Sequence, residues 1–160
     1  MATQGKYAEF QYDGQLCAGH LLVWTWRKLV VGHDDCPVLT REYERFAGPQ
    51  AEALLSAFAA FLLALGRASR RTLMVGQPYC AGLTADEERM LRLIAAAQSG
   101  DGVLLWAHLA WLARRDYQDD VRLAANRLAD ALREAGVTLP PVRQPKPSKT
   151  AALEMVHAPV

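Results

Sequence analysis

Apolar residues in the first half of the chain recur in runs that suit helices. Residues 15–31 are apolar almost all round, which predicts a first helix through the middle of the protein. The spacing predicts a short second helix over 40–46, which the Gly48-Pro49 pair interrupts. Pro49 suits the first turn of a third helix over 49–66, whose polar stripe is thin, so we expect this helix to lie in the core.

The second half of the chain returns to helical spacing after a connection over 67–83 that lacks a period. A Thr-Ala-Asp-Glu sequence begins at Thr84 and predicts a capping box, followed by a helix that ends at Gly100. The next helix is expected over 101–112, and the short Ser-Gly-Asp-Gly joint before it indicates that these two helices are antiparallel neighbours. A sixth helix is expected over 117–135.

The composition favours the all-α fold class. The chain has 27 alanines and 23 leucines against one isoleucine and 11 valines, and straight-chain residues lose less rotamer freedom in helices than β-branched residues do. Its 160 residues suffice for one buried core, and a hydrophobic fraction of 51% excludes a disordered protein. We therefore expect a compact bundle of about five or six helices over 15–136, with an N-terminal arm over 1–14 and a flexible tail over 137–160.

Two segments of the chain resemble each other at a spacing of 44 residues. Aligning 29–46 with 73–90 gives eight identities in eighteen positions, among them Cys36 with Cys80 and a shared Leu-Thr pair at a helix start. This pattern predicts one helix-loop-helix unit that is used twice. We therefore expect the two loops of this duplicated unit to superpose.

The sequence shows no sign of export or membrane insertion. Residues 1–14 lack a basic segment followed by an apolar one, so they do not match a secretory signal. The longest apolar stretch, 53–65, is shorter than the roughly 20 residues that a membrane-spanning helix needs. Three cysteines in a chain of this size are typical of reduced thiols. We therefore expect a cytoplasmic protein that does not bind a membrane.

Two pairs of cysteine and histidine resemble zinc ligands. Cys17 with His20, and His33 with Cys36, together form the pattern C-x2-H-x12-H-x2-C. If the residues between the pairs are helical, the rise of about 1.5 Å per residue separates the pairs by roughly 20 Å, too far for one ion. We therefore expect no metal site and no cofactor. The alternative is a thiol-redox or metal sensor centred on Cys36 and Cys80, with His33 nearby.

Two clusters of arginine follow the ends of apolar helices. They consist of Arg67, Arg70, Arg71, Arg114 and Arg115. With Trp106 and Trp111 nearby, such clusters suggest a surface for single-stranded nucleic acid. Arginines at a helix end also interact favourably with the negative end of the helix dipole. Since a net charge of +1 is untypical of nucleic-acid binders, nucleic acid is the third alternative and is not the partner that we expect.

The sequence contains no motif of a known catalytic site. It lacks a glycine-rich phosphate loop, a G-x-S-x-G elbow and an H-E-x-x-H zinc motif. The carboxylate pairs Asp34-Asp35, Glu87-Glu88 and Asp119-Asp120 are neighbours in sequence, which do not share a helix face. His108 lies in an apolar helix, where we expect a core histidine. We therefore expect a protein with no catalytic residues.

The tail suggests a function. Residues 140–150 contain four prolines and three basic residues, which favour an extended and solvated chain. Leu153, Met155 and Val156 then form a small apolar patch that suits a tethered docking peptide. We expect an adaptor or regulatory subunit that binds another protein, or a second copy of itself, through an apolar groove or this tail.

Overall fold

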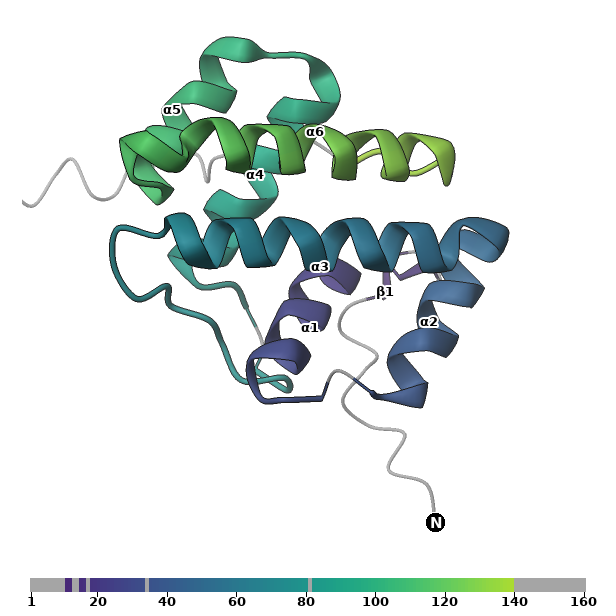
Figure 1. Ribbon diagram of the computed structural model, residues 1–160. Coiled ribbons are helices and arrows are strands. Elements are labelled where there is room, and N and C mark those ends of the chain that lie inside the picture. Colours follow the sequence, from purple (N-terminus) through teal and green to yellow (C-terminus); the bar gives the residue numbers. More distant parts are fainter. Residues whose placement is uncertain (1–10, 13–14, 17, 34, 81, 140–160) are drawn as a thin grey trace, which may run out of the picture.

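The computed structural model describes residues 11–12, 15–16, 18–33, 35–80 and 82–139, most of which are helical (Figure 1). The helices are α1 (Ala18–Val30), α2 (Pro37–Ala47), α3 (Ala51–Ala68), α4 (Ala85–Ser99), α5 (Gly102–Leu112) and α6 (Gln118–Glu134). Two short strands, β1 (Gln11–Tyr12) and β2 (Gln15–Leu16), pair antiparallel before α1. The expected all-α fold class is confirmed.

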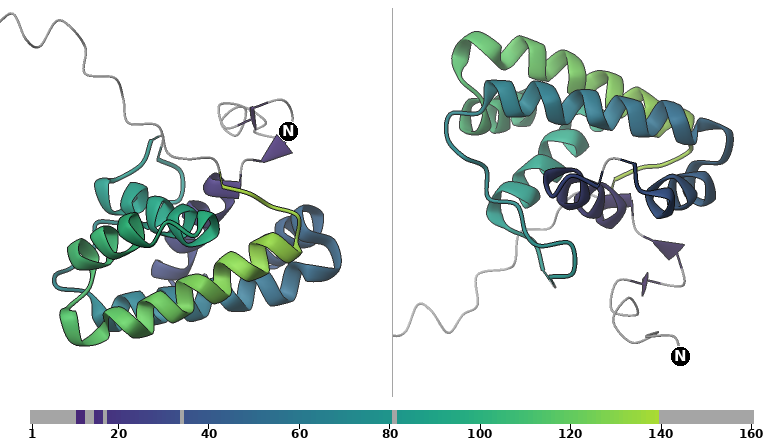
Figure 2. Two further views of the ribbon diagram at one scale, coloured as in Figure 1. Left: turned by 90° about the horizontal axis from the view of Figure 1, so that it is seen from above. Right: turned by 60° about the horizontal axis from the view of Figure 1, so that its bottom comes forward.

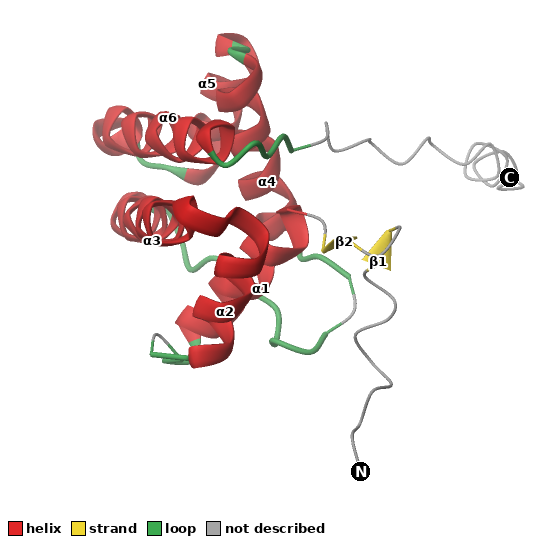
Figure 3. Ribbon diagram, turned by 90° about the vertical axis from the view of Figure 1, so that its right-hand side faces the viewer, coloured by secondary structure: helices red, strands yellow, loops and turns green. Residues whose placement is uncertain are grey.

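Helices α3 and α6 form the central pair and run side by side in opposite directions (Figures 1 and 2). Helices α4 and α5 pack on α6, and α2 packs on α3. Helix α1 lies on the same side of α3 as α2, as the view along the central pair shows (Figure 3). The connection over 69–84 leaves the end of α3, passes α1 and returns to the start of α4.

The central pair buries one apolar stripe from each helix. On α3 the stripe consists of Leu54, Phe58, Phe61 and Leu65. On α6 it consists of Val121, Ala125, Leu128 and Leu132. A spacing of three or four residues puts each stripe on a single face, so burial of the stripes fixes how the two helices meet. The prediction that the third helix lies in the core is correct for this face only, because Leu63 is 63% exposed.

The stretch Pro37–Ala68, which is α2 followed by α3, is long and apolar enough to cross a membrane, the only such stretch among the described residues. It is not one straight helix, since Gly48 has a positive φ of 53° and a 3₁₀ turn over Gly48–Gln50 separates its two halves. Core helices of soluble proteins pass the same test of length and composition. This stretch is therefore weak evidence for a membrane span.

Most of the predicted helix ends are observed. Thr84 and Glu87 form the expected capping box, in which each side chain accepts a hydrogen bond from the backbone amide of the other residue. Asp101 caps α5 by accepting from the amide of Leu104, and Gly100 takes the left-handed conformation that ends α4. These ends depend on residues close in sequence, which is why the sequence predicts them.

Several predicted boundaries differ from the structure. The first helix begins at Ala18 rather than at 15, because Gln15 and Leu16 pair with β1 as a strand. Pro49 lies in the 3₁₀ turn over Gly48–Gln50 rather than in the first turn of the third helix, which spans Ala51–Ala68 instead of 49–66.

Helix α2 begins at Pro37 rather than at Thr40, because a proline in the first turn has no amide that needs an acceptor there. At the other end of the chain, the helical body continues past the predicted boundary at 136. Val137 packs against the core and Leu139 is buried.

Gln98 of α4 fixes this last segment through both ends of its side-chain amide. Its Nε2 donates to the carbonyl of Val137 at 2.9 Å, and its Oε1 accepts from the amide of Leu139 at 2.8 Å. The first three residues assigned to the tail therefore belong to the helical body. The remaining tail, 140–160, lies outside the described residues.

The structure does not confirm the duplicated unit. Thr84 is the N-cap of α4, whereas Thr40, its equivalent in the alignment, lies inside α2. Gly32 has a positive φ of 82°, whereas Gly76 does not adopt a positive φ. The two loops therefore have different backbones, and the sequence identities do not correspond to one structural unit used twice.

A buried hydrogen bond joins α1 to α2. The hydroxyl oxygens of Thr25 and Tyr43 lie 2.9 Å apart, and both side chains are fully buried. Thr25 already donates its proton to the carbonyl of Leu21 at 2.7 Å, so the Tyr43 hydroxyl is the donor in the bond between the helices.

We expect Tyr43→Phe to lower the free energy of unfolding by about 1 kcal/mol, because it removes one hydrogen bond and leaves Thr25 bonded to Leu21. Thr25→Val should cost more, about 1–3 kcal/mol, since the Tyr43 hydroxyl then stays buried without an acceptor. Urea unfolding followed by circular dichroism measures both losses. The control is Tyr79→Phe, at a residue that is 71% exposed, and it should change little. Equal losses in all three variants would contradict the assignment.

Candidate functional site

A buried ion pair joins the end of α1 to the start of α4. Arg27, in the last turn of α1, is 5% exposed, and Glu87, in the first turn of α4, is fully buried. Arg27 Nε and Nη2 each donate a hydrogen bond of 2.7 Å, one to each carboxylate oxygen of Glu87. A bidentate pair fixes orientation as well as distance, so this pair sets where α4 begins relative to α1.

The same ion pair holds the connection between α3 and α4. Arg27 donates to the carbonyl of Cys80 at 2.9 Å and to that of Gly82 at 2.7 Å. Glu87 accepts from the amide of Gly76 at 2.9 Å. Gly76 leaves room for the guanidinium, since a Cβ at this position would lie 2.9 Å from Arg27 Nη2. A connection with no helix or strand of its own is thereby fixed by two buried charged groups.

Asp86 is a second anchor for this connection. Arg71 donates to its two carboxylate oxygens at 2.8 and 2.7 Å, and the amide of Met74 donates to it at 2.8 Å. The hydrogen bonds from Arg71 hold the pKa of Asp86 below its usual value. Asp86 therefore stays ionised and bonded to the connection at neutral pH.

The capping-box pattern predicts the bond between Glu87 and Thr84 but not the ion pair with Arg27. An arginine within an almost continuous apolar helix is the signal that points to a buried partner, because arginine is rarely fully buried unless it is paired. No local pattern identifies that partner, since Arg27 and Glu87 are 60 residues apart in sequence.

The residues of the proposed metal sensor do not assemble a metal site. Within the part of the chain that the structure describes, no three His, Cys, Asp or Glu side chains are arranged to hold a metal ion, and this includes His33, Cys36 and Cys80. Cys17, which belongs to the zinc-like pattern, lies outside the described residues.

Cys36 and Cys80 are free thiols in different surroundings. Cys36 is the N-cap residue of α2, and Cys80 lies exposed in the connection. Backbone amides of Leu39 and Val38, together with the charge of Lys28, lower the pKa of the Cys36 thiol. The start of α2 therefore favours the thiolate form of Cys36.

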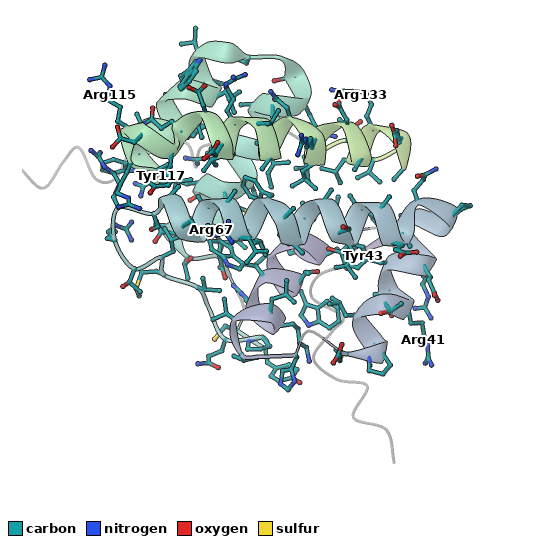
Figure 4. All side chains as sticks on the ribbon, in the orientation of Figure 1. Arg41, Tyr43, Arg67, Arg115, Tyr117 and Arg133 are labelled. Carbon is teal, nitrogen blue, oxygen red and sulfur yellow. The ribbon has the colours of Figure 1, made fainter. Side chains whose placement is uncertain are left out.

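The two arginine clusters lie together at one end of the bundle. An antiparallel bridge pairs Ser69 with Ala113, so the residues that follow α3 lie beside those that follow α5. Figure 4 shows Arg67 and Arg115 towards the same end of the central pair, away from Arg133 at the opposite end of α6. Two segments that are distant in sequence thus lie side by side.

Three of the five clustered arginines have structural partners. Arg70 donates to the carbonyl of Ala110 in the last turn of α5 at 3.1 Å. Arg114 donates to the carbonyl of Arg67 in the last turn of α3 at 2.8 Å. Arg70, which follows α3, therefore caps α5, and Arg114, which follows α5, caps α3. Arg71 is bonded to the acidic start of α4. These contacts support the helix-end interpretation of the clusters over nucleic-acid binding.

Helix α5 presents an uncharged apolar surface to solvent. Its 11 residues contain no acidic or basic side chain apart from one histidine, and only Leu105, Leu109 and Leu112 are buried. Exposed fractions on its outer side reach 83% for Val103 and 59% for Trp111. A surface helix is ordinarily polar on its outer side, so α5 is unusual. We define the α5 face as Val103, Leu104, Trp106, Ala107, Ala110 and Trp111, which are all exposed.

Arginines from neighbouring helices flank the α5 face. The guanidinium of Arg89, from α4, lies 4.3 Å from the ring centroid of Trp111, and that of Arg122, from α6, lies 5.7 Å from the ring centroid of Trp106. These cation–π contacts hold both indole rings in place. Burial and two nearby arginines lower the pKa of His108, which is half-buried rather than part of the core, so α5 is uncharged at neutral pH.

The predicted docking residues of the tail, Leu153, Met155 and Val156, lie outside the described residues. The sequence predicts a helix over 101–112 but does not indicate which of its residues are exposed. The signal available was the lack of charge across the whole helix, which leaves no polar side for solvent.

We expect Glu87→Gln to lower the free energy of unfolding by about 3–5 kcal/mol, because it leaves the buried Arg27 guanidinium without its counter-charge. The matched control is Asp119→Asn, at an exposed carboxylate that pairs with Arg122 on the surface of α6. This control should cost less than about 1 kcal/mol. Urea unfolding at neutral pH measures both losses of stability. Similar losses would show that the buried ion pair stabilises the fold no more than an exposed one.

The pH dependence of stability gives a second readout for the same variant. Burial alone would raise the pKa of Glu87, but hydrogen bonds from Arg27 and two backbone amides outweigh it and hold the pKa below its usual value of 4.5. The resulting stability is complete above the pKa of the unfolded chain and is lost as the pH falls towards the folded-state value. Thermal unfolding at decreasing pH should therefore show a loss of stability below about pH 4.5 that is smaller in Glu87→Gln.

Comparison of the sequence with known protein families and with curated proteins finds no match, and comparison of the structure with solved structures finds none. What the chain does is therefore inferred from its own residues.

Proposed function

We propose that this protein is a non-catalytic interaction protein that binds another protein chain through the α5 face. The observation that supports this function is a helix without ionised side chains whose outer side is exposed. Burying apolar surface is favourable by about 25 cal/mol per Å². The side chains of Val103 and Trp111 leave much of their apolar surface exposed to water. A contiguous exposed patch of this kind marks a binding site, whereas single exposed residues do not.

The chemistry of the α5 face favours a protein over nucleic acid as partner. The face itself is uncharged, and Arg89 and Arg122 lie against the indole rings on which bases would otherwise stack. Tryptophan and arginine are enriched at the centres of protein interfaces. Because the rings of Trp106 and Trp111 are already held in place, little ordering entropy is lost when a partner covers them.

Photo-crosslinking tests this function. We expect benzoylphenylalanine in place of Val103, which is 83% exposed, to form a discrete covalent adduct with a protein when cells containing the full chain are irradiated. Trp106→Glu in the same chain should reduce the adduct about tenfold, because a charge within an apolar contact costs at least about 1.4 kcal/mol. Mass spectrometry of the adduct identifies the partner.

The control places the same photoreactive group at Leu63 of α3, which is 63% exposed on a different helix. It should give at most a weak and heterogeneous background. Equal adducts from the two positions, an adduct that Trp106→Glu leaves unchanged, or no adduct from Val103 would each contradict the proposed function.

A second candidate function is a thiol sensor at Cys36. It is favoured by the position of this thiol at the start of α2, where backbone amides and Lys28 lower its pKa. The thiolate is the form that reacts with oxidants, so a lower pKa raises the reactivity of Cys36 at neutral pH.

We expect Cys36 to react with iodoacetamide several times faster than Cys80 at about pH 7, although Cys80 is the more exposed of the two. The difference should shrink at higher pH, where the lowered pKa of Cys36 no longer gives it an advantage. Mass spectrometry of peptides from the labelled full chain follows each cysteine separately. If Cys80 reacts as fast as Cys36 at neutral pH, the sensor assignment is wrong.

A further inference from the structure

We infer that the α5 face is occupied by a second copy of this chain, with the two α5 helices antiparallel about a two-fold axis near Ala107. This inference rests on the function proposed above and names the partner. Two-fold dimers are the commonest assemblies of soluble proteins, and the two-fold axis brings the same face of each copy together. The face must then be complementary to itself, in charge and in shape.

The two ends of α5 carry opposite charges. Asp101 immediately precedes the helix, Arg70 donates to the carbonyl of Ala110 in its last turn, and Arg115, next to Asp116, follows the helix closely. In an antiparallel pair, Asp101 of each copy lies beside the arginines of the other, so both ends of the contact are paired. A uniformly acidic partner would meet Asp101 at one end, and a uniformly basic partner would meet the two arginines at the other. A second copy is the occupant that satisfies both ends at once.

The apolar side chains match in the same register. Residues three or four apart lie on one face of a helix. With Ala107 at the axis, Val103 of one copy therefore lies beside Trp111 of the other, and Leu104 lies beside Ala110. Each pair occurs twice, so the most exposed of the large apolar side chains of α5, Val103, is covered by the more exposed of its two indole rings, Trp111. The small side chains of Ala107 and Ala110 let the helix axes approach to about 8 Å.

The contact is small, which sets the expected affinity. A helix of 11 residues is about 16 Å long. Standard protein interfaces cover about 800 Å² on each partner, so a pair of α5 helices with Arg89 and Arg122 at its edges lies at the low end. We therefore expect a dimer that forms reversibly and dissociates on dilution.

Sedimentation velocity of the full chain, at concentrations from about 1 to about 200 µM, tests this inference. We expect an equilibrium between monomer and dimer. Val103→Glu should raise the dissociation constant more than about thirtyfold, because the two-fold axis introduces the charge twice, and its exposed position should leave the fold intact by circular dichroism. Leu63→Glu, on α3, is the matched control and should change the constant less than about twofold.

Asp101→Asn tests the charge pairing separately. Asparagine caps a helix as well as aspartate does, so α5 should still begin at Gly102 while the charge opposite the arginines is lost. We expect the dissociation constant to rise about threefold and its dependence on salt to weaken. An unchanged constant would show that the ends of α5 are not paired in the way that we infer.

Ala107→Cys tests the position of the axis. In a chain whose own cysteines are replaced by serine, mild oxidation should link two copies through this residue, because the axis brings the two sulfur atoms together. Leu63→Cys in the same background should stay unlinked.

Two results would overturn the inference: a chain that is monomeric at every concentration, or a dimer that Val103→Glu leaves intact. If the monomeric chain still forms an α5-dependent adduct with a different protein in cells, the proposed function stands with another partner. If neither a dimer nor an adduct forms, the inference and the proposed function both fail.

Discussion

The buried pair of Arg27 and Glu87 joins α1, α4 and the connection between α3 and α4 at one point, and the placement of these three parts depends on it. A long connection without secondary structure loses conformational entropy when it becomes ordered, and it buries little apolar surface that would offset this loss. Its hydrogen bonds to the ion pair, through Gly76, Cys80 and Gly82, supply the compensating interactions. Since α5 packs on α4, the ion pair also determines where the α5 face lies.

Local chemistry explains how much of this fold the sequence predicts. The capping box at Thr84 and the N-cap at Asp101 depend on residues three positions away, so their patterns are visible in the chain itself. The ion pair depends on residues 60 apart, and only the packing of α1 brings them together. The predicted repeat is not confirmed for a related reason, because its matching glycines meet different structural needs. Gly32 is needed for a positive φ, whereas Gly76 is needed because the guanidinium lies against it, so one residue type serves two different purposes.

The sequence predicts that α5 is a helix, but it does not predict that one side of this helix is exposed. A helix that is apolar all round is ordinarily buried on all sides, and its residue pattern contains no indication of which side lacks a neighbour. In the structure, α4 and α6 cover only the side that carries Leu105, Leu109 and Leu112, and the described chain has no element outside it. The exposure of the α5 face is therefore a consequence of topology rather than of the sequence of α5.

The arginine clusters connect the fold to the proposed interface. Their composition alone suggests a phosphate-binding surface, yet Arg70 and Arg114 are held by the carbonyls that end α5 and α3. The bonds that close the ends of these helices thus also fix a positive charge beside the C-terminal end of α5, while the N-cap at Asp101 fixes a negative charge beside its N-terminal end. A helix that needs these caps to fold therefore presents opposite charges at its two ends and apolar side chains between them, which is the pattern that a second, antiparallel copy complements.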